Sequence, residues 1–205
     1  MNIIDDEKIY ETLKQAEITD TVSADAILRK ARELKGLDPL EIAVLMNVSD
    51  PAQLEAMFEA ARFVKNEIYG SRLVIFAPLY VSNLCANECS YCAFRAKNST
   101  VRRRALSQQE IKSETEALID QGHKRVLLVA GESYPNEGFK YILDSIKTVY
   151  GVKKGKGEIR RVNVNVSPLT LAEFKQLKDT NIGTYQLFQE AYHRTTYGQV
   201  HLGGK

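Results

Sequence analysis

The stretch Leu73-Val-Ile-Phe-Ala-Pro-Leu-Tyr80 is an apolar run, and it is followed closely by Cys85-Ala-Asn-Glu-Cys89-Ser-Tyr-Cys92. The run predicts a buried strand, and the cysteines, spaced C-x-x-x-C-x-x-C, would lie on the loop after it. Three thiolates on one loop can hold three irons of a cubane cluster, and the fourth iron then stays open to an external ligand. The spacing therefore predicts a reactive 4Fe-4S centre at the end of a strand.

These are the only three cysteines among 205 residues, and they lie too close together for unstrained disulfides. Thiols that are free or metal-bound are typical of a reducing compartment. The first residues show no signal-peptide pattern, and the apolar run is far shorter than a membrane span. We therefore expect a cytoplasmic protein with no membrane partner.

The charge of the chain is nearly balanced, with 28 lysines and arginines against 26 acidic residues. A formal charge of +2 does not indicate wholesale binding to nucleic acid. The hydrophobic content of 44% is sufficient for a buried core and is ordinary for a globular domain.

Two Asp-Pro pairs in the first seventy residues predict helix starts, because aspartate caps a helix and proline suits its first turn. The pairs are Asp38-Pro39 and Asp50-Pro51, and Gly70 is a typical helix end. Over residues 51–69, apolar residues recur every three or four positions, as in an amphipathic helix packed on a core. We predict a helical N-terminal extension over residues 1–70.

From residue 71 to residue 205, short apolar strands alternate with helices. Strands are predicted at 73–80, 125–130, 161–166 and 184–189, and the capping boxes Ser107-x-x-Glu110 and Thr170-x-x-Glu173 open two of the helices. The alternation predicts an α/β fold with a parallel sheet, namely a partial (β/α) barrel of about four units. Because a complete barrel has eight units, we expect a fragment or a truncated product. The stretch 151–157 is interpreted as a solvated loop.

Residues that could bind a ligand or take part in a reaction follow the predicted strands, at the edge where β/α sheets bind ligands. They are Gly131-Glu132 after the second strand, Asn163, Asn165 and Ser167 on or after the third, and Gln189-Glu190 with His193-Arg194 after the fourth. The two asparagines alternate with valines, so they either bind substrate or form a hydrogen-bonded buried pair.

The cysteine loop resembles the signature of the radical S-adenosylmethionine (SAM) superfamily, in which an aromatic residue, here Tyr91, precedes the last cysteine. In that superfamily the methionine amino and carboxylate groups of SAM chelate the open iron, and its reductive cleavage gives a 5′-deoxyadenosyl radical. The resemblance implies a 4Fe-4S cluster, SAM and a reductant such as ferredoxin or flavodoxin. The alternative is a structural zinc site formed by the cysteines with His123 or His193.

The resemblance also implies residues that bind SAM. Gly131-Glu132 is similar to the family's glycine-glutamate motif beside the methionine ammonium, Glu190 to an acid that binds the ribose hydroxyls, and Arg194 to a partner of the methionine carboxylate. Glu190 and Arg194 could instead belong to a surface ion-pair set, and His193 is either a substrate ligand or merely exposed. The run Arg102-Arg103-Arg104 is interpreted as a solvated or cluster-compensating surface, since no aromatic residues interleave it.

Several longer stretches resemble the aromatic amino-acid lyase branch of the superfamily: 76–94, 122–125, 160–165 and 183–190. Within it they are most similar to the HydG family of FeFe-hydrogenase maturases, and next to the ThiH family of tyrosine lyases in thiamine synthesis. The resemblance implies that the radical takes a hydrogen from the amino group of tyrosine, and that cleavage of the Cα–Cβ bond yields p-cresol and dehydroglycine. Hydrogenase maturases then form the CO and cyanide ligands of the H-cluster.

The sequence departs from the HydG pattern in two respects. No cysteine follows Cys92, so a second cluster cannot be built from this chain, and the second half of the barrel is absent. Ala191 and Thr195-Thr196 stand where the pattern has a threonine and a proline. These departures leave a second hypothesis open, a non-catalytic remnant that binds a cluster or a partner barrel without turnover.

Overall fold

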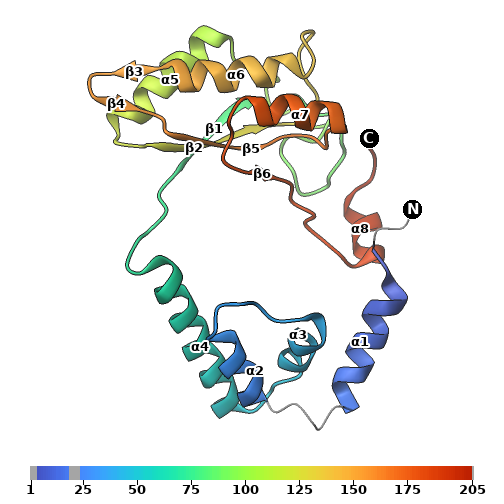
Figure 1. Cartoon of the computed structure of the whole chain (residues 1–205). Helices are drawn as coiled ribbons and strands as arrows, with labels where there is room; N and C mark the ends of the chain where they lie inside the picture. The colour runs from blue at the N-terminus through green and yellow to red at the C-terminus, as the bar shows by residue number, and fades with distance from the viewer. Residues whose placement is uncertain (1–3, 19–23, 205) are drawn as a thin grey trace. The chain divides into compact units, whose positions relative to one another are not determined.

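The computed structural model describes residues 4–18 and 24–204. The chain separates into two compact units, residues 1–74 and 75–205, whereas the sequence placed the boundary after residue 70 (Figure 1). The first unit is helical and the second contains a sheet with helices.

Among its described residues, the first unit holds the helices α1 (Asp6–Ile18), α2 (Ala24–Ala31), α3 (Pro39–Met46) and α4 (Pro51–Tyr69). Asp38 and Asp50 cap α3 and α4 as predicted; Asp38 forms a capping box with Glu41. The predicted packing face of α4 is covered only in part. Ala60 is the buried residue of this helix, and Ile68 is exposed.

The second unit alternates strands and helices. Its elements are β1 (Ala77–Ser82), α5 (Gln108–Asp120), β2 (Arg125–Ala130), α6 (Lys140–Gly151), β3 (Lys153–Lys154), β4 (Gly157–Glu158), β5 (Arg161–Asn165), α7 (Leu171–Asp179), β6 (Tyr185–Gln186) and α8 (Arg194–Val200). Strands β1, β2, β5 and β6 form one sheet in this order, and every pair is parallel. The predicted partial (β/α) barrel is thus confirmed.

Three predicted element bounds were wrong. Residues 73–76 are not part of β1; the strand begins at Ala77, opposite Val126, and the four apolar side chains before it are 48–81% exposed. The last strand is reduced to Tyr185–Gln186, since only these residues pair with β5. The predicted loop 151–157 ends α6 and then contains a short antiparallel hairpin of β3 and β4.

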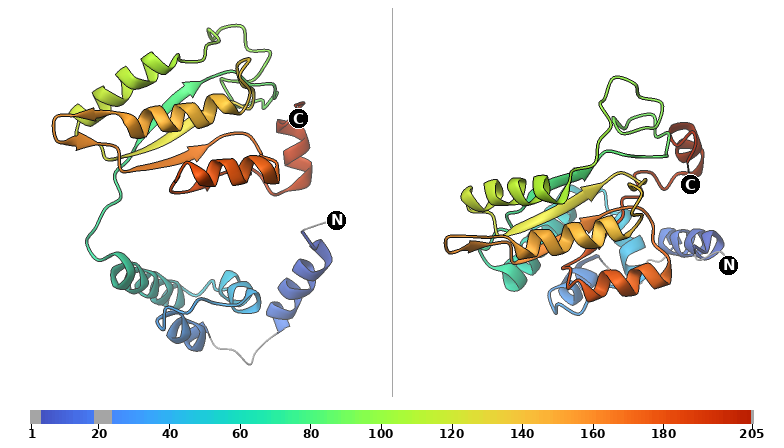
Figure 2. Two further views of the ribbon diagram at one scale, coloured as in Figure 1. Left: turned by 45° about the horizontal axis from the view of Figure 1, so that its top comes forward. Right: turned by 90° about the horizontal axis from the view of Figure 1, so that it is seen from above.

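Helices α5, α6 and α7 cover one face of the sheet (Figure 2). The alternation along the strands explains this packing: Val162 and Val164 of β5 are fully buried in the core, while Asn163 and Asn165 lie on the other face. Ile111 of α5 and Ile146 of α6 complete the core. Both predicted capping boxes are present, at the starts of α5 and α7.

None of the helices in the described part of the chain combines the length and the apolarity that a bilayer span requires.

Candidate metal centre

The cysteine loop begins where β1 ends, at the carboxyl edge of the parallel sheet. Its base is closed by the backbone, because the amide of Asn83 donates to the Arg104 carbonyl and the amide of Leu106 donates to the Val81 carbonyl. The loop is therefore anchored to β1 at both of its ends.

Cys85, Cys89 and Cys92 are free thiols, and each is half-buried. Burial raises the pKa of the Cys89 thiol, and the nearby Cys92 and Cys85 raise it further. The loop thus brings three thiols into one neighbourhood, although among the described residues no three cysteine, histidine or acidic side chains are already gathered in a metal-binding geometry. Three sulfur donors suit an iron–sulfur cluster, and binding a metal would release the proton that the raised pKa of Cys89 retains.

Tyr91 lies between the cysteines and the C-terminal part of the described chain. Its hydroxyl is 2.8 Å from Nε2 of His201, and the two rings meet edge to face. Desolvation, followed by the negative charges of Cys89 and Glu190, raises the pKa of Tyr91 to about 12.

The Gly131-Glu132 pair follows β2 directly and packs against the same loop. A Cβ at Gly131 would come within 3.1 Å of Cys85 Cβ. The charge of Glu132 contributes to the raised pKa of Cys89 and of Tyr185 on β6. Gly131 thus borders the cysteine loop.

The segment after β6 carries the other two predicted residues. Glu190 is exposed and has a left-handed φ of 64°, and Arg194 is the first residue of α8 and is also exposed. His193 caps that helix, because its ring nitrogen accepts from the Thr196 amide. This cap gives His193 a local structural role.

The asparagines of β5 have protein partners. Asn165 donates to the Gln186 carbonyl at 3.1 Å, and Asn163 accepts from the Arg161 side chain at 3.2 Å. Ser167, also predicted at this edge, is buried and lies 2.5 Å from the Tyr134 hydroxyl. These contacts favour the reading of the asparagines as hydrogen-bonded residues over that of substrate ligands.

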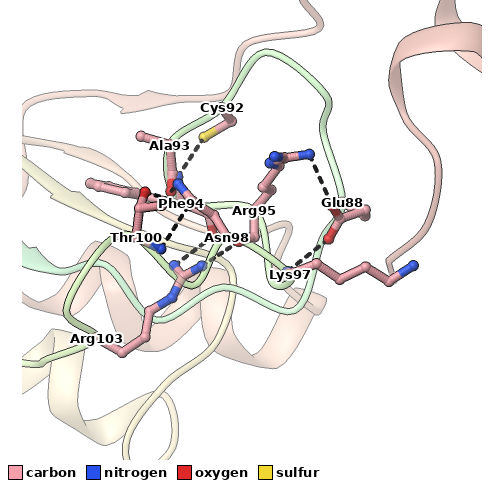
Figure 3. A network of polar contacts seen from close by, with 9 residues as sticks. All are labelled: Glu88, Cys92, Ala93, Phe94, Arg95, Lys97, Asn98, Thr100 and Arg103. Carbon is pink, nitrogen blue, oxygen red and sulfur yellow. Dashed lines mark hydrogen bonds and ion pairs between the residues drawn. The ribbon is translucent and has the colours of Figure 1, made fainter.

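Sequence reasoning missed two side chains that hold the cysteine loop (Figure 3). Glu88 is buried; it accepts from the Lys97 amide at 2.9 Å and pairs with Arg95 at 3.5 Å. Arg103 was expected on a solvated or cluster-compensating surface, yet its side chain turns inward and donates to backbone carbonyls of the loop. An acidic residue between two cysteines was the sequence signal available for Glu88, whereas Arg103 has identical neighbours and gave none.

Residues 200–203 also contact the loop, which the sequence did not predict. The amides of Ser90 and Glu88 donate to the carbonyls of Val200 and Gly203, each at 2.8 Å, and the Leu202 amide donates to the Glu88 carbonyl at 3.1 Å. The middle of the cysteine loop is therefore fixed by a segment more than a hundred positions away.

Comparison with known proteins agrees with this geometry. A family model described as Radical SAM superfamily matches residues 79–201. A crystal structure of HydG, described as a maturase of the [FeFe]-hydrogenase, is 48% identical with a TM-score of 0.91, and the match covers 100% of this chain and 45% of that one. HydG from Carboxydothermus hydrogenoformans is 39% identical with a TM-score of 0.79, covering 97% of this chain and 45% of that one.

Among curated proteins, the 2-iminoacetate synthase of Escherichia coli (strain K12) is 29% identical over 165 residues, which is 80% of this chain and 42% of that protein. The chain thus spans less than half the length of these relatives.

Proposed function

Since this chain belongs to the radical SAM superfamily, whose members catalyse radical reactions, we propose that Cys85, Cys89 and Cys92 hold a 4Fe-4S cluster with one iron open to SAM. The observation that carries this proposal is the position of three free thiols, spaced C-x-x-x-C-x-x-C, on the loop after the first strand of a parallel sheet. Cluster and SAM together would supply reductive formation of a 5′-deoxyadenosyl radical, and the protein would supply positioning and exclusion of side reactions.

We further propose which residues would bind SAM. Gly131 leaves room beside Cys85, and the carboxylate of Glu132, whose charge acts on Cys89, would accept from the methionine ammonium. Glu190, whose charge acts on Tyr91, would accept from the ribose hydroxyls. Arg194 would donate to the methionine carboxylate from the start of α8.

The substrate that we propose is tyrosine. Its support is the 48% identity to HydG over the whole of this chain, together with the similarity to 2-iminoacetate synthase. The proposed reaction takes a hydrogen from the tyrosine amino group and cleaves the Cα–Cβ bond, giving p-cresol and dehydroglycine with one 5′-deoxyadenosine and one methionine per SAM consumed. Two electrons would come from a reductant such as ferredoxin or flavodoxin: one cleaves SAM, and the second, together with a proton, converts the cresol radical left by the Cα–Cβ cleavage into p-cresol.

The similarity to 2-iminoacetate synthase favours one alternative, a ThiH-like role in which the same cleavage serves thiamine synthesis. Formation of CO and cyanide is not proposed for these 205 residues, because no cysteine follows Cys92 to hold a second cluster.

The test begins with anaerobic reconstitution of the chain with iron and sulfide. We expect about four irons per chain, a reduced cluster visible by electron paramagnetic resonance, and a change of that spectrum on addition of SAM. Cys89→Ala should lose most of the iron, whereas Ser90→Ala, at the adjacent position, should retain it. A colourless protein that binds tetrahedral zinc would contradict the proposal.

The reaction is tested on the reconstituted protein with dithionite, SAM and tyrosine. Turnover is expected to give 5′-deoxyadenosine and p-cresol in equal amounts. A cluster that responds to SAM without forming either product would favour the non-catalytic remnant over the tyrosine lyase.

A further inference from the structure

Arg103 stands in a run of three arginines, and its side chain turns into the cysteine loop (Figure 3). Its side chain is half-buried, and one guanidinium nitrogen donates to the carbonyls of Asn83, at 2.8 Å, and of Phe94, at 2.7 Å. The second terminal nitrogen donates to the carbonyl of Arg95. A single side chain therefore satisfies three backbone acceptors.

These acceptors lie on both sides of the cysteines in the sequence. Asn83 precedes Cys85, whereas Phe94 and Arg95 follow Cys92. The guanidinium thus ties the beginning of the cysteine loop to its end. Only a planar, multidentate donor can do so; a lysine ammonium carries a similar charge but cannot span three carbonyls in this geometry.

One of the tied residues also contacts a cysteine sulfur. The Phe94 amide donates to Cys92 Sγ at 3.4 Å, while the Phe94 carbonyl accepts from Arg103. Hydrogen bonds to cysteine sulfurs are among the factors that set the reduction potential of an iron–sulfur cluster, because they stabilise the more negative, reduced form. The position of Phe94 therefore matters for redox chemistry as well as for shape.

We propose that Arg103 is a positioning residue for the cluster: it clamps the cysteine loop closed and holds Phe94 so that its amide bonds the sulfur of Cys92. This inference rests on the proposed function, since it concerns the cluster that the three cysteines would hold. It assigns Arg103 no contact with SAM or with the substrate.

The neighbouring arginine offers a matched control. Arg102 is exposed, and Arg104 pairs with Glu110 at 2.6 Å outside the loop. Arg102→Gln therefore removes the same charge from the adjacent position and leaves the hydrogen bonds of Arg103 to the loop intact. Arg103→Lys keeps the positive charge but removes the planar guanidinium with its several donors.

The experiment compares the wild-type chain with Arg103→Gln, Arg103→Lys and Arg102→Gln. Each protein is reconstituted, its midpoint potential is measured by a redox titration monitored by electron paramagnetic resonance, and the release of iron to a chelator is timed. Both Arg103 variants should show a more negative potential and roughly tenfold faster iron release, a size consistent with the loss of charge-assisted hydrogen bonds to the backbone. Arg102→Gln should behave as wild type.

Three outcomes would overturn the inference while leaving the proposed function intact. The first is equal potentials and release rates in all four proteins. The second is a change in Arg103→Gln that Arg103→Lys restores, which would assign the effect to charge alone. The third is unfolding of both Arg103 apoproteins in circular dichroism, which would assign Arg103 to stability of the fold. A wild-type chain that takes up no cluster would instead overturn the proposed function, and this inference with it.

Discussion

Gly131 lies directly against Leu84: a Cβ at position 131 would come within 2.2 Å of the Leu84 carbonyl oxygen. Backbone hydrogen bonds join the same two segments, because the Gly131 amide donates to the Ser82 carbonyl at 3.0 Å and the Ser133 amide donates to the Leu84 carbonyl at 3.2 Å. The end of β2 thus fixes the start of the cysteine loop, and the close approach requires a glycine.

Gly131→Ala should therefore displace the loop and lower both stability and iron uptake. Because the clash is with backbone, which cannot move aside as a flexible side chain could, we expect a loss of about 1–3 kcal/mol in the free energy of unfolding by urea. Gly151→Ala, at the last residue of α6, meets nothing within 4 Å and should be neutral or slightly stabilising. Equal stability of the two variants would contradict the prediction.

Tyr141 of α6 hydrogen-bonds to both ends of the cysteine loop. Its buried hydroxyl contacts the carbonyls of Val81, at 2.9 Å, and Leu106, at 2.8 Å, which flank the loop. Tyr141→Phe should cost roughly 1–3 kcal/mol of unfolding free energy, because the Leu106 carbonyl loses its donor in a buried setting. Tyr192→Phe, with a ring that is 82% exposed, is the control and should change little. A Tyr141→Phe protein as stable as wild type would contradict this prediction.

The same tyrosine predicts a loss of stability at alkaline pH. Burial raises the pKa of Tyr141 to about 12, whereas a tyrosine in the unfolded chain titrates near 10. Its contribution is therefore fully present below pH 10 and is lost as the pH rises towards 12. Unfolding free energies measured across this window should fall more steeply for wild type than for Tyr141→Phe. Parallel curves would rule out a contribution of this hydroxyl.

At acidic pH, Glu110 predicts that the free energy of unfolding falls as the pH falls, by less than Tyr141 contributes at alkaline pH. Hydrogen bonds from the Ser107 backbone and side chain, with Arg104 nearby, hold the pKa of the Glu110 carboxyl below its usual range. Its contribution is present above pH 4.5 and is lost as the pH falls through the lowered pKa. Glu110→Gln keeps the capping-box geometry but does not titrate, so its stability should fall less between pH 5 and pH 3 in urea titrations. An identical fall in both proteins would contradict this assignment.

Much of the fold was predictable because its signals are local. The caps at Asp38, Asp50, Ser107 and Thr170 involve residues within three positions of each other. Strand β2 coincides with the apolar run that predicted it. The predicted start of the first strand failed because strand ends depend on the partner: residues 73–76 are as apolar as the strand itself, yet β2 provides no residues opposite them. Hydrophobicity alone does not define where pairing begins.

The amino-acid sequence by itself determined the C-x-x-x-C-x-x-C loop, its place after the first strand of a parallel sheet and the superfamily, since each of these is written in neighbouring residues. Only the tertiary structure decided which arginine of the run clamps the loop and what meets Tyr91. Arg103 reaches a carbonyl 20 positions away, and Tyr91 meets His201 across 110 positions. Such contacts depend on how the whole chain packs, because three identical arginines differ only in what the folded backbone places beside them.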